Sequence, residues 1–307
     1  MTNKHVLGID TSNYKTSVAL VSDNEIIIDH RKFLEVKEGE RGLRQSEAFF
    51  QHVKNLPEIF ETINKELDGE IAAVAYSSRP RPLDGSYMPC FLAGESFAKS
   101  IASFLKVPAF AFSHQEGHIA AASYGIEDTL GPEFIACHFS GGTCELLHNF
   151  EIIGGTKDIS FGQVLDRTGV AMGMAFPAGE ELDEIACRTL NAGNTLSAIK
   201  VKDAYINLSG FESQIQRNIG SVDRDELIKE IFDKTADSIS KMLIQASDKT
   251  GVKNILLSGG VASSSYIRNR VQSDFADGKI SVLFGESSLS SDNAVGIALL
   301  GRKLLWD

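Results

Sequence analysis

Long apolar runs, paired cysteines and a surplus of basic residues are all missing from this chain of 307 residues. No stretch of about 18 or more apolar residues is present to form a transmembrane helix, and the first residues lack the apolar core of a signal peptide. The four cysteines contain no C-x-x-C pair and suggest no disulfide framework. These absences predict a soluble, cytoplasmic protein with reduced thiols and no membrane contact.

A strong positive charge is absent as well, because the formal net charge is −11 at pH 7. A protein that grips nucleic acid alone normally presents a basic face. The lysines and arginines of residues 32–44 are interleaved with glutamates. If a polynucleotide is the substrate, we therefore expect a partner protein to help hold it.

What the chain does contain is a globular composition, with 43% hydrophobic and 23% charged residues. Apolar strand patterns alternate with amphipathic helix patterns, which predicts an α/β fold. The strand–polar loop–strand pattern of residues 5–22 recurs at residues 134–149 and predicts two related lobes. We place these lobes at residues 1–113 and 114–307, with a last helix at about residues 292–305 that can pack back on the first lobe.

Three stretches of the first lobe carry further expectations. Residues 30–44 are charged and predict a loop, and residues 77–89 are rich in proline and predict irregular structure. Between them, residues 45–67 predict a helix that is broken or kinked at Pro57. The expected apolar side of this helix consists of Phe49, Phe50, Val53, Leu56, Ile59, Phe60 and Ile63.

His114 and His118 lie four positions apart at the start of a predicted helix, so their side chains project from one face about a turn apart. That spacing lets two imidazoles bind one cation, and imidazole suits zinc, iron, nickel or copper. Asp292, in the polar stretch before the last helix, is the candidate third ligand. The alternative interpretation is a histidine pair satisfied by hydrogen bonds and an Asp292 that only caps that helix.

The position of the acidic residue excludes a zinc protease helix. In the H-E-x-x-H pattern the glutamate follows the first histidine directly, where it can activate metal-bound water. Here Gln115 holds that position, and Glu116 lies roughly 200° round the helix from His114. Gly117 is also a poor residue for a helix interior.

Three loops can present backbone amides to an anion. Asp10 ends the first strand, and the polar turn of residues 11–16 can face a phosphate with that carboxylate nearby. The Ser140–Gly142 loop allows close approach because glycine lacks a Cβ. Gly259 and Gly260 precede a helix that begins near Ser265, and a helix N-terminus is a ready anion or nucleotide site. Ordinary turns are the alternative for each loop.

Taken in chain order, these motifs resemble the TsaD family, the bacterial members of the Kae/TsaD/Qri glycoprotease-like group in the actin/Hsp70/sugar-kinase (ASKHA) superfamily. The resemblance covers nearly the whole chain and implies two lobes with a ligand cleft between them. The motifs that carry it are Gly8–Ser12, Ala73–Tyr76, His114–His118, Ser140–Gly142, Asp166–Thr168, Pro177–Gly179 with Asp183, Leu208–Gly210, Ser258–Val261 and Ser291–Ala294.

The resemblance implies one divalent metal, iron or zinc, held by His114, His118 and Asp292, and an adenine nucleotide or acyl-adenylate as ligand. It also implies transfer of a threonylcarbamoyl group from its adenylate to the adenosine beside the tRNA anticodon. The residues that it places at the nucleotide or substrate are Thr11, Ser12, His138, Phe139, Ser140, Gly141, Gly142, Asp166, Gly179, Asp183, Gly259, Gly260 and Ser264. The candidates for a catalytic role are Asp10, Lys15 and Glu116.

The chain departs from the family pattern at the loops while it keeps the framework. The changes are Tyr14 and Lys15 for two aspartates of E-T-S-C-D-D-T, Thr143 for the histidine of S-G-G-H-T, Ser264 for the asparagine of G-G-V-x-x-N, and residues 79–82 for a glycine-rich loop. This pattern is typical of a divergent paralogue with altered chemistry.

Three functions therefore stay open. The first is the family's transferase activity on tRNA, assisted by TsaB-like and TsaE-like proteins. The second is a paralogue that uses the same metal and nucleotide sites for another acceptor or for ATP hydrolysis. The third is a non-catalytic, TsaB-like partner in a homodimer or heterodimer. A glycoprotein endopeptidase is the least expected, because of the spacing given above.

Overall fold

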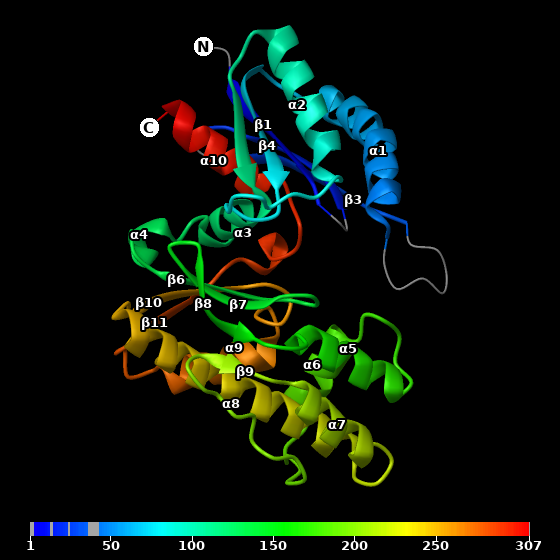
Figure 1. Cartoon of the computed structure of the whole chain (residues 1–307), viewed down its shortest axis with the longest axis vertical. Helices are drawn as coiled ribbons and strands as arrows, with labels where there is room; N and C mark the ends of the chain where they lie inside the picture. Colours follow the sequence, from blue (N-terminus) through cyan, green and yellow to red (C-terminus); the bar gives the residue numbers. More distant parts are fainter. Residues whose placement is uncertain (1–2, 13–14, 24, 36–42, 307) are drawn as a thin grey trace. The chain divides into compact units, whose positions relative to one another are not determined.

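A computed structural model describes residues 3–12, 15–23, 25–35 and 43–306 (Figure 1). Two compact units make up the chain: unit 1 contains Met1–Tyr124 and Ser291–Asp307, and unit 2 contains Gly125–Ser290. The division falls after Tyr124, whereas the sequence pattern predicts it after residue 113. The reason is that α3 (His114–Ser123) packs against α10 (Val295–Trp306), the helix that returns to the sheet of unit 1.

Unit 1 is built on a five-stranded sheet with the order β3-β2-β1-β4-β5. Its strands are β1 (Lys4–Thr11), β2 (Lys15–Val21), β3 (Ile26–Phe33), β4 (Glu70–Arg79) and β5 (Ala109–Ser113). Helices α1 (Gln45–Glu66) and α2 (Phe91–Leu105) cover one face, and α3 and α10 lie on the other (Figure 1).

The alternation of side chains along β1 decides which of its residues reach each face. Leu7 and Ile9 belong to the apolar core shared with α1 and α2. Gly8 faces the opposite way, because a Cβ there would lie 2.7 Å from the Cβ of Ala298 on α10. Asp10, two positions further on, therefore points to the side of α3 and α10.

Unit 2 repeats this arrangement with a six-stranded sheet in the order β11-β10-β6-β7-β8-β9. Its strands are β6 (Ile135–Phe139), β7 (Cys144–His148), β8 (Glu151–Thr156), β9 (Tyr205–Ile206), β10 (Asn254–Ser258) and β11 (Ser281–Phe284). The first three strands pair antiparallel, and β10 pairs parallel with both β6 and β11. The same pairing links β1–β3 and then β4 and β5 in unit 1, which confirms the predicted pair of related α/β lobes.

The helices of unit 2 surround one large apolar core. They are α4 (Glu127–Leu130), α5 (Phe161–Ala171), α6 (Gly179–Arg188), α7 (Ser209–Asn218), α8 (Arg224–Thr250) and α9 (Ser265–Asp274), with a short 3₁₀ helix at Ser287–Leu289. None of the helices in the described part of the chain combines the length and the apolar character that a bilayer crossing requires.

Two local expectations were wrong because strand pairing overrides the sequence pattern, and of the break or kink expected at Pro57 the break is absent. β3 continues to Phe33, where it pairs with Lys15 of β2, so part of the expected charged loop is strand. β4 continues to Arg79, which pairs with Ser113 of β5. Helix α1 runs through Pro57 without a break.

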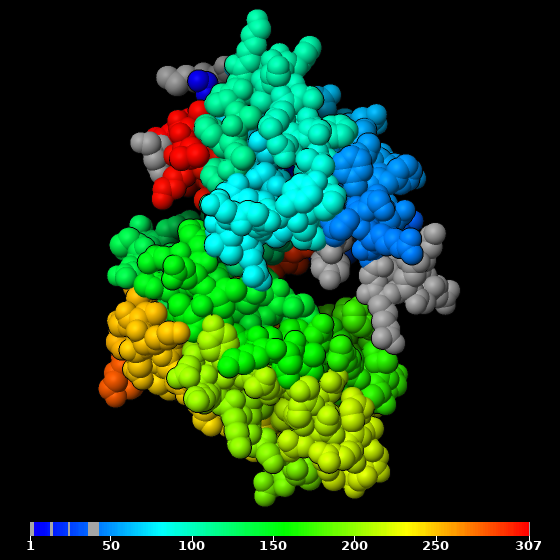
Figure 2. All heavy atoms as spheres, viewed as in Figure 1, coloured from blue at the N-terminus to red at the C-terminus, as the bar shows by residue number. Residues whose placement is uncertain are grey.

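The apolar side of α1 is the expected one in its second half, where Leu56, Ile59, Phe60 and Ile63 pack in the core, and differs in its first half. Phe50 is 64% exposed, and Phe49 and Val53 are exposed as well, whereas His52 and Asn55 are buried. Part of α1 lies at the molecular surface (Figure 2). The buried face of the helix therefore combines apolar side chains with a polar pair, which a purely hydrophobic pattern does not reveal.

Candidate functional site

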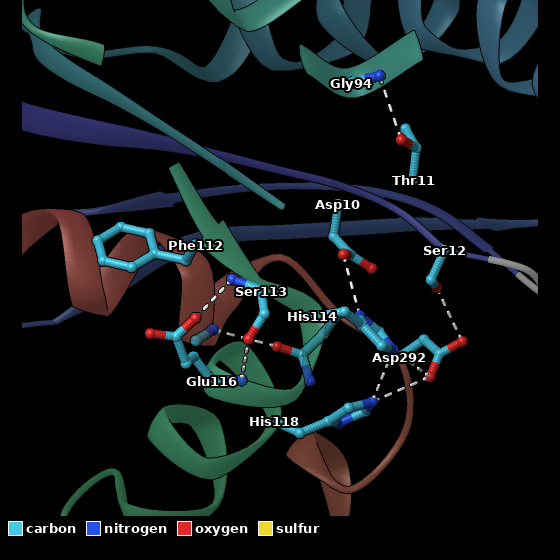
Figure 3. Close-up of polar contacts among 12 residues, drawn as sticks. Asp10, Thr11, Ser12, Gly94, Phe112, Ser113, His114, Glu116, His118 and Asp292 are labelled. Carbon is cyan, nitrogen blue, oxygen red and sulfur yellow. Dashed lines mark hydrogen bonds and ion pairs between the residues drawn. The ribbon is translucent and has the colours of Figure 1, made fainter. Parts of the chain in front are cut away.

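The histidine pair stands at the beginning of α3, directly after β5. Ser113 caps this helix: its hydroxyl accepts a hydrogen bond from the backbone N–H of Glu116 over 3.2 Å. The Glu116 carboxylate in turn accepts from the backbone N–H of Ser113 over 2.6 Å (Figure 3). Such a reciprocal capping box satisfies two helix-end donors and fixes where the helix begins. The carboxylate of Glu116 is thus engaged in capping, which leaves its suggested catalytic role without structural support.

The ligand atoms of His114, His118 and Asp292 converge on one point (Figure 3). The two histidine Nε2 atoms lie 2.9 Å apart. Oδ1 of Asp292 lies 3.5 Å from Nε2 of His114 and 3.3 Å from Nε2 of His118. In the described part of the chain, this is the one group of three histidine, cysteine or acidic side chains with such an arrangement.

The two separations from Asp292 fit a single small cation, whereas the two histidine nitrogens, at 2.9 Å, lie closer together than a bound ion would hold them. Zinc–nitrogen bonds of about 2.1 Å in a tetrahedral site place neighbouring ligand atoms about 3.4 Å apart. Two imidazole nitrogens and a carboxylate oxygen also form a donor set suited to zinc or iron. The contacts of Asp292 are with Ser12 and the two histidines, and it is Asn293 that caps α10, through its Oδ1 and the backbone N–H of Gly296. The metal-ligand interpretation of Asp292 is therefore the one that its contacts favour.

Asp10 stands behind the histidine pair. Its side chain is fully buried, and its Oδ1 accepts a hydrogen bond from Nδ1 of His114 over 3.0 Å (Figure 3). A carboxylate in this position fixes the ring tautomer, since the proton on Nδ1 leaves the Nε2 lone pair free for a metal. Asp10 is thus placed to orient a ligand, a role that differs from direct acid–base catalysis.

Charge is distributed unevenly within this group. Burial opposes a positive His114, but the Asp10 and Asp292 carboxylates outweigh it and raise the pKa of His114 well above 6.5. Burial likewise opposes a negative Asp292, but hydrogen bonds from both histidines hold its pKa well below 3.8. The two carboxylates therefore favour a positive charge on His114.

The end of β1 is attached to three other parts of unit 1. Thr11 is buried, and its hydroxyl donates to the carbonyl of Cys90 over 3.1 Å. The same hydroxyl accepts from the N–H of Gly94 on α2 over 3.1 Å (Figure 3). Ser12 donates through its hydroxyl to Oδ2 of Asp292 over 3.0 Å. Thr11 therefore helps to pack α2, while Ser12 contacts the candidate metal ligand Asp292; the hydrogen of each hydroxyl is engaged within the protein.

Lys15 lies next to the same site. Its side chain is buried, and its Nζ donates to Oγ of Ser291 over 2.9 Å and lies 4.5 Å from the centre of the Phe33 ring. Burial lowers the pKa of Lys15 below 10.5, and the nearby Asp292 carboxylate partly offsets this effect. Arg31 also donates to Ser291 Oγ, over 2.9 Å. Tyr14, the neighbouring departure from the family pattern, lies outside the described residues.

Apart from Thr11 and Ser12, which belong to unit 1, the residues predicted for the nucleotide lie in unit 2, around the carboxyl end of its sheet. β6 ends with His138 and Phe139 and β10 ends with Ser258, and the two strands run parallel, so both following loops lie at the carboxyl end of the sheet. His138 contacts Ser258 through Nδ1 and Oγ over 3.2 Å. Ligands of open α/β sheets bind at this end of the strands.

Glycines leave the backbone open at this edge. A Cβ on Gly141, Gly142, Gly179 or Gly260 would meet no atom within 4 Å. Gly259 is different, because its φ of +97° and a Cβ position 2.3 Å from the carbonyl oxygen of Phe139 both require glycine. Protein packing thus explains Gly259, whereas open space lies beside the other four; the carbonyl of Gly141 accepts a hydrogen bond from the Ser160 hydroxyl.

Two acidic residues at this edge are already engaged. Asp166 accepts from the backbone N–H of Ala178 over 3.0 Å. Asp183 accepts from the backbone N–H groups of Ser265 over 2.8 Å and Tyr266 over 3.0 Å, and from the hydroxyl of Ser264. The N-terminus of α9, predicted as a free anion site, is therefore capped by the protein's own carboxylate.

Sequence reasoning missed His52 and Asn55, which lie under the end of β1. His52 contacts the carbonyl of Ser12 and the hydroxyl of Thr16, and Asn55 contacts the same hydroxyl. The available signal was a pair of polar residues three positions apart on the buried side of an amphipathic helix.

Solved structures with a similar fold identify the fold class of this chain. HypF from T. kodakarensis, a solved structure, is 15% identical and aligns with a TM-score of 0.65 over 99% of this chain and 48% of its own. The ROK hexokinase from Thermus thermophilus is 12% identical, with a TM-score of 0.55 over 97% and 99%. These likenesses show the two-lobed ASKHA fold.

The family follows from the sequence comparisons. The family model described as "TsaD: tRNA N6-adenosine threonylcarbamoyltransferase" matches residues 30–299. A relative of that name from Thermosipho africanus is 30% identical over 97% of this chain and 94% of its own. Another from Neorickettsia sennetsu is 28% identical over 97% and 93%. The chain belongs to the TsaD family, and its relatives are named as transferases.

Proposed function

We propose that this protein is a metal-dependent transferase of the TsaD type. It moves a threonylcarbamoyl group from its adenylate to the exocyclic amine of an adenosine next to the tRNA anticodon. The observation that carries the proposal is the convergence of His114, His118 and Asp292, with buried Asp10 behind them, in a chain of this family. A non-catalytic partner protein has no use for such a group.

The reaction is an acyl transfer. The adenosine amine attacks the carbamoyl carbonyl carbon, a nitrogen–carbon bond forms, the carbon–oxygen bond to the phosphate breaks, AMP leaves and the amine loses a proton. A divalent metal, iron or zinc, would supply Lewis acidity toward a carbonyl or phosphate oxygen of the substrate. The protein's own contribution is the orientation of the three ligands and, through binding, of the amine.

Each residue of the metal centre has a defined part in this proposal. Asp10 keeps the proton of His114 on Nδ1, so that Nε2 faces the metal. Ser12 occupies Oδ2 of Asp292, so that Oδ1 faces the two histidines. These buried contacts preorganise the ligands.

The adenine nucleotide or acyl-adenylate is proposed to bind at the open carboxyl edge of the sheet in unit 2. The exposed backbone of Gly141, Gly142 and Gly260 supports this, since amides without neighbouring side chains can approach phosphates. The carboxylates of Asp166 and Asp183 accept hydrogen bonds from backbone N–H groups, so these residues would contribute by holding the backbone at this end of the sheet in place.

Partner proteins are part of the proposal. The net charge of −11 disfavours tight binding of tRNA by this chain alone. TsaB-like and TsaE-like proteins are therefore proposed to assist, in the cytoplasm.

A reconstituted transfer assay tests the function. It contains the protein, TsaB-like and TsaE-like partners, threonylcarbamoyl adenylate and unmodified tRNA. We expect modified adenosine from the wild-type protein and none from His114→Ala, while His148→Ala, a histidine outside the metal centre, keeps the activity. Absence of product from wild-type protein that carries metal and binds an adenine nucleotide would exclude tRNA as the acceptor.

Lys15 supports a second candidate function. A buried ammonium beside Asp292 changes the charge of the site at a position where the family pattern has an aspartate. The same centre would then act on a different acceptor or hydrolyse ATP. Phosphate release from ATP that requires metal and is lost in His114→Ala, without any tRNA product, would favour this candidate.

A further inference from the structure

A chain of buried hydrogen bonds connects α1 to the metal centre. His52 is 0% exposed and Asn55 is 6% exposed, although both are polar and both lie on the core side of the helix. Thr16, at the start of β2, is also 0% exposed and contacts both residues. Buried polar groups are costly unless they are hydrogen-bonded, so the partners of these side chains indicate why they are there.

The direction of each bond can be assigned. The carbonyl oxygen of Ser12 can only accept, so Nε2 of His52 carries the proton and donates to it over 2.8 Å. Burial lowers the pKa of His52 below 6.5, so the ring is neutral and its Nδ1 accepts. The Thr16 hydroxyl therefore donates to Nδ1 over 2.9 Å.

The remaining hydrogen bond of this chain joins Asn55 to Thr16. The side-chain amide of Asn55 donates to the Thr16 hydroxyl over 3.1 Å. With its own hydrogen committed to His52, that hydroxyl has only its acceptor side left, which is the side that an amide N–H requires. The path thus runs from Asn55 through Thr16 and His52 to Ser12 with every donor and acceptor matched.

Ser12 is the point where this path meets the metal centre. Its backbone carbonyl is held by His52, and its hydroxyl donates to Oδ2 of Asp292. We propose that His52 is a positioning residue of the metal centre: it holds Ser12, and Ser12 sets the direction of the Asp292 carboxylate. This inference rests on the proposed metal site.

The physical reason is the geometry of the third ligand. Asp292 precedes α10 and has no helix of its own to hold it. With Oδ2 fixed by Ser12, Oδ1 is the oxygen that lies 3.5 Å and 3.3 Å from the two histidine Nε2 atoms. Outer hydrogen bonds of this kind typically contribute about 10- to 100-fold to metal affinity.

Zinc affinity of the purified full chain, measured by competition with a chromophoric chelator, tests the inference. We expect His52→Leu to weaken zinc binding by about 10- to 100-fold. We also expect His52→Gln to restore most of it, because an amide can donate to Ser12 and accept from Thr16. The visible absorption bands of the Co²⁺-loaded protein should change in His52→Leu and return in His52→Gln.

A matched control separates positioning from general destabilisation. Leu56→Ala removes another fully buried side chain of α1 that has no link to Ser12, and it should leave zinc affinity unchanged within about twofold. Ser12→Ala should weaken binding as His52→Leu does. The double variant with His52→Leu and Ser12→Ala should bind zinc as tightly as the weaker-binding of the two single variants, because both substitutions break the same chain of hydrogen bonds. If His52→Leu does not fold, Thr16→Val tests the same path with a nearly isosteric change.

The outcomes are distinguishable. Equal zinc affinity and equal Co²⁺ spectra in wild type and His52→Leu would overturn this inference and leave the proposed metal site intact. Additive losses in the double variant would also overturn it. A wild-type protein that binds no zinc, cobalt or iron would overturn both the inference and the metal proposal.

Discussion

Gly117 of α3 and Gly296 of α10 lie so close that a Cβ on Gly296 would be 1.8 Å from the carbonyl oxygen of Gly117. A Cβ on Gly117 would be 2.8 Å from Cδ1 of Ile297. The two glycines let the helices approach backbone to backbone, and this approach brings Asp292, just before α10, to the histidines of α3. Gly117, a poor residue for a helix interior by propensity, is therefore explained by packing.

Gly296→Ala should consequently lower both stability and metal affinity. The added methyl group must push α10 away from α3, and overpacking of this kind costs about 1–3 kcal/mol. Urea unfolding measures the first effect and zinc competition the second. Gly210→Ala on α7, where a Cβ would meet nothing within 4 Å, is the control and should be neutral or stabilising. Wild-type zinc affinity in Gly296→Ala would show that the helix contact does not position Asp292.

Metal binding should stabilise the folded protein through these ligands. Free zinc at one hundred times its dissociation constant adds about 2.7 kcal/mol to the free energy of unfolding. Differential scanning fluorimetry with and without zinc should therefore show a higher melting temperature for wild type and little change for Asp292→Asn. Asp128→Asn, an exposed acid on α4, should respond as wild type does. An equal zinc response in Asp292→Asn would remove Asp292 from the ligand set.

Lys15→Met should tighten metal binding. The ammonium of Lys15 contacts Ser291, the neighbour of Asp292, and therefore repels a cation held by Asp292. Its removal should raise zinc affinity by about tenfold, a change of about 1.4 kcal/mol. Lys99→Met, on the exposed surface of α2, serves as the control. Tighter metal binding together with lost transfer activity would assign Lys15 to the reaction itself, whereas unchanged affinity would contradict the electrostatic argument.

Acid should destabilise the protein partly through His52. Burial lowers the pKa of His52 below its ordinary value of 6.5, so the unfolded chain takes up a proton that the folded chain refuses. This contribution to stability is complete above pH 6.5 and is lost as the pH falls from there toward the folded pKa. The urea midpoint of wild type should therefore fall more steeply over this range than that of His52→Gln. His30→Gln on β3 is the control, and identical pH profiles for wild type and His52→Gln would contradict the assignment.

Gly142→Leu should abolish nucleotide binding without unfolding unit 2. A Cβ at this position meets no protein atom within 4 Å, so the free energy of unfolding should change little. A leucine side chain would, however, cover the backbone that is proposed to face the phosphates. Isothermal titration calorimetry with a non-hydrolysable ATP analogue measures the effect, with Gly210→Leu on α7 as the control. Wild-type affinity in Gly142→Leu would place the nucleotide elsewhere.

The two-lobed fold of this protein and the placement of its histidine pair could be predicted from the amino-acid sequence alone. Alternating strand and helix patterns, repeated in residues 5–22 and 134–149, determined the two related α/β lobes. The spacing of His114 and His118 determined that both rings share one face of a helix, because 3.6 residues complete a turn. These features depend on local periodicity, which is present in the sequence itself.

Only the tertiary structure decided what the polar residues do. Nothing local distinguishes Asp292, which turns to His114 and His118, from Asp223, which caps α8, because both precede helices in polar stretches. Burial of His52 likewise depends on which side of α1 meets the sheet. Side-chain roles of this kind arise from contacts between residues as far apart as Ser12 and Asp292, 280 positions along the chain, and these contacts exist only once the chain has folded.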